Sequence, residues 1–471
     1  MAILIASEAY FAAVYEAIQK AEHSILLLGW TFDPRTRLTP DGLADPSAPD
    51  EIGRILLRLS EARPDLDIRL LIWKSALPVA ATQDFFPHAA RKWFKGTRIK
   101  FRLDDEVPFG ACHHQKVVVI DDRLAFCGGG DISVDRWDSW HHLPEDLRRI
   151  LPTKIQHAPR HEVMMMVDGD AARSLGDHVR DRWRRLGEPG PAPAPENGLD
   201  LWPGHVPSLF VHSPVAIART MPAWHGSAVI EEIRALTLDC IARAREAIYL
   251  ENQYFTSPLI TEALAARLAE PDGPEVVLIS SGRAPSWFDR LTMDRARAAM
   301  ITRLSAADVF GRFRALYPTT SGGGGIIVHS KCSIFDDRIV RVGSANLNNR
   351  SFGFDSECEL AVECQSDAAR RNLLAFRDKL VGHFIGVTGE AVANARTTHG
   401  GLVQAIDMLN SEGRLVPIAG KRPNALDALI AAYHIGDPAA VSDSWRLGRR
   451  RRRLALEAGL SRERPRRVPL V

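Results

Sequence analysis

The chain has 471 residues, of which 45% are hydrophobic and 25% charged, so it can bury the cores of two or more domains. A formal net charge of +2 gives no electrostatic reason to expect nucleic acid as a partner. Six cysteines in a chain of this length do not make a disulfide framework, and no two have the C-x-x-C spacing of a zinc site. We therefore expect neither a disulfide-rich module nor a bound metal or other cofactor.

The first eight residues have no basic start, and Ser7 and Glu8 interrupt their apolar run, which is not the pattern of an export signal. No run of 18 apolar residues occurs anywhere in the chain, so no segment is expected to span a membrane. These patterns predict a cytoplasmic or peripheral membrane protein, and secretion by a route without a signal peptide stays open.

In the first part of the chain, helices of apolar periodicity alternate with short apolar strands. The predicted helices lie at 8–22, 51–62, 82–94 and 170–185, and the predicted strands at 24–30, 67–73, 99–103, 124–127 and 161–167. A Pro-rich stretch, 187–208, has the composition of a semi-rigid connection between domains. The plan then repeats with helices at 227–245, 290–304 and 367–384 and strands at 247–251, 275–279, 312–317 and 357–363. Residues 396–440 predict further helices, and an Arg-rich tail begins at residue 446.

One stretch occurs twice. The first copy carries His114, Lys116 and Asp121, and the second carries His329, Lys331 and Asp336, with identical spacing. On a strand, a His and a Lys two residues apart point to the same face. The same interval of 215 positions separates His114 from His329, Asp121 from Asp336, and the later pair Asp131 and Asn346. A constant interval over three pairs indicates two homologous halves.

This pair of motifs resembles the phospholipase D superfamily, whose members carry two H-K-D motifs and build one active site from both. Flanking stretches at 129–131, 135–138, 248–255 and 343–351 extend the resemblance, which covers about residues 10–390 and is closest to the eukaryotic-type enzymes. It implies an α/β fold of two phospholipase D-like αβα sandwich domains related by pseudo-twofold symmetry. The implied domains are 1–186 and 209–390, joined by the 187–208 linker and followed by a helical extension and basic tail, 391–471.

A site that cleaves a phosphodiester must neutralise its oxygens, supply a nucleophile and protonate the leaving alcohol. We assign Lys116 and Lys331 to the non-bridging oxygens, and Asn346 and the Ser344 hydroxyl as hydrogen-bond donors to the same oxygens. The counterparts of these two residues in the first half are Asp131 and Gly129. An ionised Asp131 cannot donate to phosphate, so it would instead orient a lysine or a backbone turn.

The resemblance implies that His114 is the nucleophile and His329 the acid and then the base, although the residues alone leave that order open. Each imidazole should be held on its second nitrogen by a carboxylate. In the family this carboxylate lies in the strand after each motif, which matches Glu357 in the second half and Glu162 in the first. Asp121 and Asp336 complete the catalytic motifs, where we expect them to fix turns through backbone hydrogen bonds.

Several other side chains have structural or functional interpretations. His113 should point to the opposite face of its strand from His114, and the Met run at 164–166 is typical of core packing. Trp137 and Trp140 either wall the pocket or pack in the interior. The four glycines at 322–325 form either a mobile lip or a plain connection, and the Arg-rich tail is either solvated or attracted to anionic lipid.

The leading hypothesis is a phospholipase D that hydrolyses the distal phosphodiester bond of a phospholipid such as phosphatidylcholine through a phosphohistidine intermediate. A phosphatidyltransferase, such as a cardiolipin synthase, is the closest alternative. A nuclease is less favoured because no basic, aromatic groove is evident, and a non-catalytic anion-binding module is disfavoured because both His-Lys pairs are intact. The expected partner is a phospholipid at a membrane surface, with no nucleic acid, and the protein is expected to be a monomer.

Overall fold

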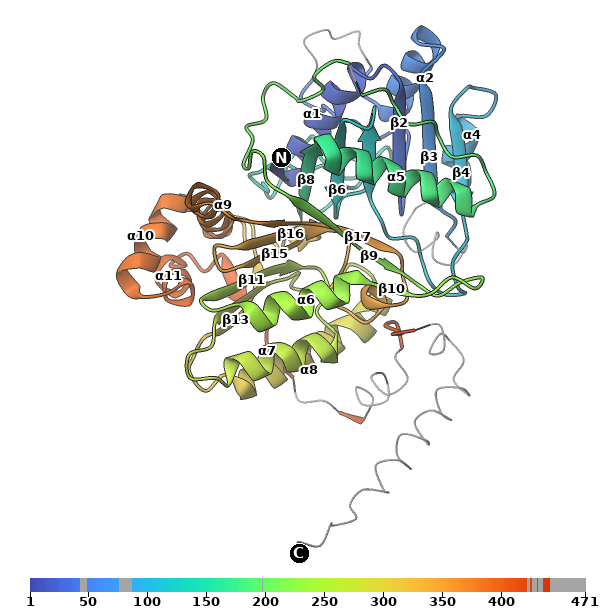
Figure 1. Cartoon of the computed structure of the whole chain (residues 1–471). Helices are drawn as coiled ribbons and strands as arrows, with labels where there is room; N and C mark the ends of the chain where they lie inside the picture. Colours follow the sequence, from blue (N-terminus) through green and yellow to red (C-terminus); the bar gives the residue numbers. More distant parts are fainter. Residues whose placement is uncertain are drawn as a thin grey trace, which may run out of the picture.

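The computed structural model describes residues 1–42, 49–75, 87–196, 198–421, 424–425, 430 and 435–440. The described chain forms two large sheets with helices on their faces. Figure 1 shows the half that comes first in the sequence above the half that follows it. The architecture is therefore α/β and two-domain, as the sequence predicts.

The first half is a seven-stranded sheet of order β1-β8-β6-β5-β2-β3-β4. Its strands are β1 (Ala2–Ile5), β2 (Ser24–Gly29), β3 (Asp67–Trp73), β4 (Lys100–Asp104), β5 (Val117–Ile120), β6 (Leu124–Gly128) and β8 (Val163–Asp168), and its helices are α1 (Ala6–Gln19), α2 (Ile52–Ala62), α4 (Pro87–Trp93) and α5 (Gly169–Arg185). Alternate side chains of β2 enter two different apolar cores, which explains its continuous apolar run. The edge strand β1 was not predicted, and residues 82–86 of the predicted helix lie outside the described residues.

The second half repeats this plan in a nine-stranded sheet of order β10-β9-β17-β16-β15-β11-β12-β13-β18. Its strands are β9 (Val215–Met221), β10 (Ile230–Glu231), β11 (Ala247–Asn252), β12 (Glu275–Ile279), β13 (Phe313–Pro318), β15 (Lys331–Phe335), β16 (Ile339–Gly343), β17 (Glu357–Glu363) and β18 (Leu415–Pro417), and its helices are α6 (Glu232–Arg243), α7 (Pro258–Leu268), α8 (Trp287–Ala307) and α9 (Asp367–Ile385). Apart from β10 and β18 at the edges of the second sheet, the order of equivalent strands is the same in both sheets. The duplication inferred from the motifs is therefore present in the topology.

One helix of the second half was predicted wrongly, and other elements were not predicted. The helix predicted at 227–245 is shorter, because residues 230 and 231 pair with β9 as a strand and α6 begins only at Glu232. Helix α7 was not predicted, although its start is marked in the sequence by Ser257, whose hydroxyl accepts from the Ile260 amide, followed by Pro258. Strand β9 was also not predicted.

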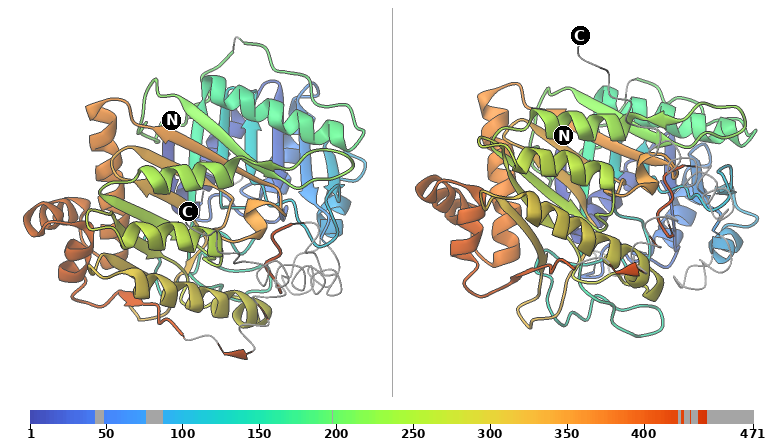
Figure 2. Two further views of the ribbon diagram at one scale, coloured as in Figure 1. Left: turned by 60° about the horizontal axis from the view of Figure 1, so that its bottom comes forward. Right: turned by 90° about the horizontal axis from the view of Figure 1, so that it is seen from below.

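The two halves meet along a shared apolar core and two short backbone pairings. The core includes residues of both sheets, such as Val117 and Leu360. A two-stranded ladder joins β7 (Arg160–His161) of the first half to β14 (Ile327–Val328) of the second. An isolated parallel bridge joins His113 of the first half to Ser356 of the second. Each motif is thus tied to the segment just before Glu162 or Glu357 of the other half. Figure 2 shows the two sheets from two further sides.

Beyond the repeat, α10 (Gly389–His399) and α11 (Leu402–Leu409) pack beside α9, at the orange end of Figure 1. They account for the first part of the helices predicted at 396–440, with α10 beginning earlier than expected. The Arg-rich tail lies outside the described residues. Among the described residues, no helix combines the length and apolar character needed to cross a bilayer.

Candidate active site

Both motif histidines open onto one cavity where the two halves meet. The cavity has a volume of about 860 Å³, and His114 and His329 are among its lining residues. Their side chains are 15% and 8% exposed. Each histidine stands just before the strand of its motif, β5 or β15, whose apolar residues anchor it in a core. The duplicated motif therefore brings two imidazoles to one pocket of a size that suits a small ligand.

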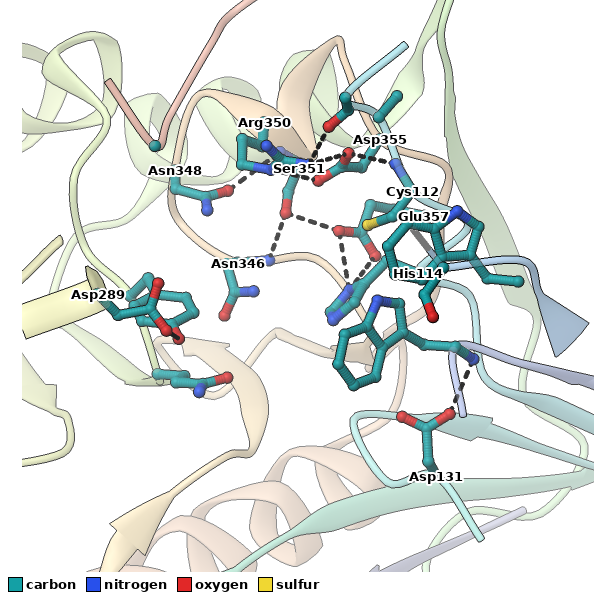
Figure 3. Close-up of a pocket in the computed structure, with 18 of the residues that line it drawn as sticks. Cys112, His114, Asp131, Asp289, Asn346, Asn348, Arg350, Ser351, Asp355 and Glu357 are labelled. Atoms are coloured by element: carbon teal, nitrogen blue, oxygen red, sulfur yellow. Dashed lines mark hydrogen bonds and ion pairs between the residues drawn. The ribbon is translucent and has the colours of Figure 1, made fainter. Parts of the chain in front are cut away.

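Glu357 holds the ring of His114 (Figure 3). The Nδ1 atom of His114 lies 3.1 and 3.0 Å from the two carboxylate oxygens. The same carboxylate accepts hydrogen bonds from the hydroxyls of Ser344, at 2.5 Å, and Ser351, at 2.6 Å. With Nδ1 occupied in this way, Nε2 is the nitrogen of His114 that is left for chemistry.

Glu162 stands in the same relation to His329. Its Oε1 lies 2.7 Å from Nδ1 of His329, which is within ion-pair distance but lacks the geometry of a hydrogen bond. The two carboxylates are exchanged between the halves, since Glu162 of the first half serves His329 and Glu357 of the second serves His114. Neither motif histidine is therefore paired with a carboxylate of its own half.

The two motif lysines lie beneath the cavity lining, each 2% exposed. Nζ of Lys116 donates to the carbonyl of His114 at 2.7 Å and is 3.4 Å from Asp131. Nζ of Lys331 donates to the carbonyl of His329 at 2.6 Å and to Gln253 at 3.2 Å. Neither lysine is among the lining residues, so the predicted direct contact with phosphate oxygens stays a prediction, while both charges act on the motif histidines.

The structure corrects two of the residues predicted to bind substrate. The Ser344 hydroxyl does not face the cavity, because it is buried, donates to Glu357 and accepts from the Cys358 amide. Gly129 is a packing position, since an added Cβ would lie 2.7 Å from the His329 carbonyl oxygen. Asn346 does line the cavity, as does Asp131.

Asp131 holds a turn and a lysine. Its Oδ1 accepts from the amides of Trp30 and Thr31, at 2.9 and 3.1 Å, and its other oxygen faces Lys116. This fits the expectation that an ionised carboxylate here orients its neighbours. The backbone of Asn346, its counterpart, is held by the Ser351 hydroxyl, which accepts from the backbone N–H of Asn346.

Asp121 and Asp336 lie away from the cavity and fix strand ends. Each carboxylate accepts three backbone amides just before the neighbouring strand, at 2.6–2.8 Å for Asp121 and 2.7–2.9 Å for Asp336. Both residues have positive φ angles, 50° and 55°, which Asp tolerates better than most residues. Their place in the motif is structural.

Burial dominates the electrostatics of the cavity. It lowers the pKa of His114 well below the ordinary value, and Lys116 and Lys331 push in the same direction. The pKa of His329 is lowered for the same reasons, with Arg160 and Arg136 adding to Lys331. Burial also raises the pKa of Glu357 to about 7. A phosphodiester anion in the cavity would offset the mutual repulsion of these cations and favour protonated imidazole.

Several residues of the cavity lining were not predicted from the sequence. Arg136 and Arg160 line the cavity and pair with Asp135, at 3.0 and 3.6 Å. Trp30 and Trp73 stack with ring centroids 5.8 Å apart on another part of the lining. Arg136 follows Asp135 within a stretch that carries the family resemblance, so the sequence held a signal for it, but nothing in the local pattern marked the two tryptophans.

Other predicted residues lie outside the cavity. Nδ1 of His113 is 2.9 Å from the Ser356 hydroxyl, on the far face of the motif segment as expected. Trp137 and Trp140 do not line the cavity and pack instead, Trp137 within the first-half core and Trp140 against His383. All six cysteines are buried and free.

Duplicated α/β halves that each lend a His-Lys motif to one shared cavity define the two-motif class of phospholipase D-like proteins. Comparison with known families agrees with this class. A family model described as "Phospholipase D" matches residues 17–202, and one described as "Cardiolipin synthase, PLD-like domain" matches residues 237–378. The chain belongs to the phospholipase D superfamily.

Curated relatives are similar at low identity. Phospholipase D A of Dictyostelium discoideum is 25% identical over 430 residues, covering 75% of this chain and 32% of the relative. Phospholipase D2 of Bos taurus is 23% identical over 485 residues, covering 80% of this chain and 50% of the relative. The chain thus spans half or less of the length of these relatives. A phosphatidylserine synthase of Haemophilus influenzae Rd KW20 shares the fold, with a TM-score of 0.56 at 14% identity over 80% of this chain and 86% of that one.

Proposed function

We propose that the protein is a phospholipase D, which hydrolyses the bond between the phosphate and the head-group alcohol of a phospholipid. The observation that carries the proposal is the single cavity lined by His114 and His329, each held by a carboxylate of the other half. The names of the relatives, and a family model for phospholipase D over the first half, support the same substrate class.

In the first step, Nε2 of His114 attacks phosphorus, a P–N bond forms, and the bond from phosphorus to the head-group oxygen breaks. His329 gives its proton to the departing alkoxide, which leaves as the free alcohol. In the second step, water attacks phosphorus, His329 takes the water proton, and the P–N bond breaks to release phosphatidate. Glu357 keeps Nδ1–H of His114 directed toward itself throughout, so that Nε2 presents its lone pair.

The proposal requires His329 to be protonated when the alcohol leaves. The pKa of His329 is lowered by burial and by neighbouring cations, so the bound substrate must raise this pKa for the imidazole to be protonated. A diester anion supplies a negative charge within a few ångströms, which raises the pKa of the imidazole. The general acid is then generated by binding, and the two histidines have different protonation states in the shared cavity.

Aromatic lining residues suit a cationic head group such as choline. Trp30, Trp73, Tyr254 and Phe288 line the cavity, and the faces of such rings attract quaternary ammonium groups. The carboxylate of Asp289, which accepts from the Tyr254 hydroxyl at 3.1 Å, adds negative charge to the lining beside Tyr254 and Phe288. We therefore propose phosphatidylcholine as a substrate.

Exposed aromatic side chains near the cavity suit contact with a bilayer. Phe109 lines the cavity yet is 82% exposed. Trp287, beside the lining residue Phe288, is 70% exposed and belongs to the other half. Transfer of such rings from water to the interfacial region of a membrane lowers the free energy, and Trp and Phe are favoured there. A lipid could then reach the cavity without leaving the bilayer entirely.

Transfer to an alcohol other than water is the second candidate, because a phosphohistidine can be taken by any hydroxyl that reaches it. The description of the second-half family model as a cardiolipin synthase domain favours it. The two outcomes differ only in the acceptor, and the same experiment separates them.

The test is choline release from phosphatidylcholine vesicles, with and without a primary alcohol, using the wild type and the His114→Ala and His329→Ala variants. We expect phosphatidate in water, some phosphatidyl alcohol when alcohol is added, and a loss of at least about 10³-fold in each variant, with folding checked by circular dichroism. Turnover of no phosphodiester by the wild type would refute the proposal, as would cleavage of nucleic acid but not lipid. Product formed only in the presence of alcohol would establish the transferase.

A further inference from the structure

Three histidines from distant parts of the chain meet outside the cavity. His142 belongs to the long loop after Asp131, His161 to β7, and His383 to the last turn of α9. One ring nitrogen of each lies within 4.8 Å of those of the other two. None of the three lines the cavity, and the proposed reaction does not use them.

Two of the three rings are oriented by buried carboxylates. Nδ1 of His142 is 2.7 Å from Oδ2 of Asp138, which also accepts from the Arg160 amide. Nε2 of His161 is 2.9 Å from Oε2 of Glu251. Carboxylates that accept from a second ring nitrogen are the usual neighbours of metal-binding histidines, because they fix the tautomer and leave the other nitrogen as a donor of its lone pair.

That orientation creates a conflict between the two rings. The hydrogens of His142 and His161 point to Asp138 and Glu251, so Nε2 of His142 and Nδ1 of His161 both present lone pairs when the rings are neutral. These two nitrogens face each other at 3.2 Å. Two lone pairs at this distance repel unless a positive centre lies between them, and that centre is either an additional proton or a metal ion.

The third ring favours the metal ion. Nε2 of His383 is buried and has no hydrogen-bond partner among the described residues. Its ring centroid lies 5.0 Å from that of His142 and 5.6 Å from that of His161. A single shared proton would satisfy the first two rings and leave this nitrogen unpaired, whereas a metal ion can bind all three.

The geometry points to a binding site for a divalent transition-metal ion of the zinc type, with His142, His161 and His383 as ligands. Around tetrahedral Zn²⁺, with Zn–N of about 2.0–2.1 Å, ligand nitrogens lie roughly 3.3–3.4 Å apart. The 3.2 Å between His142 and His161 is close to this distance, and the His383 nitrogen would have to approach by no more than about 1.5 Å on binding of the ion. Imidazole ligands favour zinc and its neighbours over magnesium or calcium.

Such an ion would join the two halves beside the cavity. His142 and His161 are in the first half and His383 is in the second. The carbonyl of His161 accepts from the amides of His329 and Ser330, at 2.9 and 3.1 Å, and the next residue is Glu162. The ion would therefore hold in place the segment that positions both His329 and its carboxylate, as a structural rather than a reacting group.

The test measures the metal content of the full-length protein, purified without a histidine tag, after incubation with Zn²⁺ or Co²⁺ and removal of free ions. We expect about one ion per chain, the visible spectrum of tetrahedral Co²⁺, and a rise in melting temperature of several degrees. The variants His142→Gln and His383→Gln should lose all three signals. The matched control is His141→Gln, which removes an exposed histidine from the same loop and should keep them.

Three results would overturn the inference. The first is that the wild type retains no metal and shows no shift in melting temperature, which would leave a shared proton as the positive centre. The second is that folded His383→Gln retains the ion. The third is that His141→Gln loses the ion. If His142→Gln does not fold, His383→Gln decides, because its side chain makes no hydrogen bond through Nε2 that the substitution would break. Metal binding is measured without lipid, so its failure leaves the proposed function untouched.

Discussion

Replacing Glu357 with Gln isolates the carboxylate that holds the proposed nucleophile. Glu357 accepts from Nδ1 of His114, from Ser344 and from Ser351, so all of its close partners are donors. A glutamine amide keeps one acceptor oxygen but turns a donor toward at least one of these groups. The Nδ1–H direction of His114 is then no longer fixed, and the ring can present the wrong nitrogen to phosphorus.

The expected loss follows from comparable His-carboxylate pairs, in which substitution by the amide reduces kcat by about 10³ to 10⁴-fold. That corresponds to roughly 4 to 5.5 kcal/mol of transition-state stabilisation. The matched control is Ser351→Ala, which removes one donor and leaves the carboxylate, and which should cost less than about tenfold. The assay is initial-rate choline release at saturating phosphatidylcholine.

The effect of Glu357→Gln on the free energy of unfolding should depend on pH. Burial raises the pKa of Glu357 from 4.5 in the unfolded chain to about 7 in the fold. The stability due to this group is therefore fully present below pH 4.5 and is lost as the pH rises through 7, by roughly 3 kcal/mol at 1.36 kcal/mol per unit. Glutamine has no such dependence, so the difference in unfolding free energy between variant and wild type should shift in favour of the variant from pH 5 to pH 8. A folded Glu357→Gln protein with more than a tenth of wild-type kcat would refute the assigned role.

Three further predictions address separate parts of the molecule. Asp336→Asn should lower the unfolding free energy by about 1.5–3 kcal/mol in denaturant titration, because one of its charged contacts to backbone amides is lost, while kcat per folded molecule stays within about threefold; a large loss of kcat in folded protein would contradict a structural role. The double variant Phe109→Ser, Trp287→Ser should bind phosphatidylcholine vesicles at least about tenfold more weakly in sedimentation, but hydrolyse a short-chain monomeric substrate at the wild-type rate; unchanged vesicle binding would exclude these rings as the membrane contact. Binding of vanadate should take up protons near pH 7 and tighten as the pH falls, because the anion raises pKa values that burial has lowered. Calorimetry in buffers of different ionisation heat should find less proton uptake in His329→Asn. Equal uptake in the variant would exclude His329 as the proton acceptor.

The sequence was sufficient for the parts of the site that repeat at a fixed interval. His114 and His329, and the lysines two residues on, were found because a strand has a period of two and the duplication supplies a second copy. Asp121 was expected to hold a turn, and it does so through three backbone amides. These features depend on local geometry, which neighbouring residues determine.

Features that depend on how the two halves meet could not be predicted from the sequence. Ser344 was expected to face the phosphate because it follows a motif strand, but the fold turns its hydroxyl to Glu357. Trp30 and Trp73 reach the cavity from the ends of strands whose pattern only indicated burial. The pairing of His142 and His161 with His383 of α9 joins residues more than 200 positions apart, and no local pattern encodes such a contact.

The exchange of carboxylates between the halves explains why the duplicated design has to act as one unit. If each half held its own His-carboxylate pair, a separated half would keep an oriented imidazole. Here Glu357 accepts from His114 and Glu162 lies against His329, so separation of the halves would remove the neighbouring carboxylate from each imidazole, while Glu357 would keep its bonds to Ser344 and Ser351. The stretch from Asp131 to Glu162 in the first half is longer than the matching stretch from Asn346 to Glu357 in the second. The extra chain carries Asp138 and His142, so the sequence that breaks the symmetry of the halves is also the sequence that reaches across to α9 and secures the side of the cavity on which His329 lies.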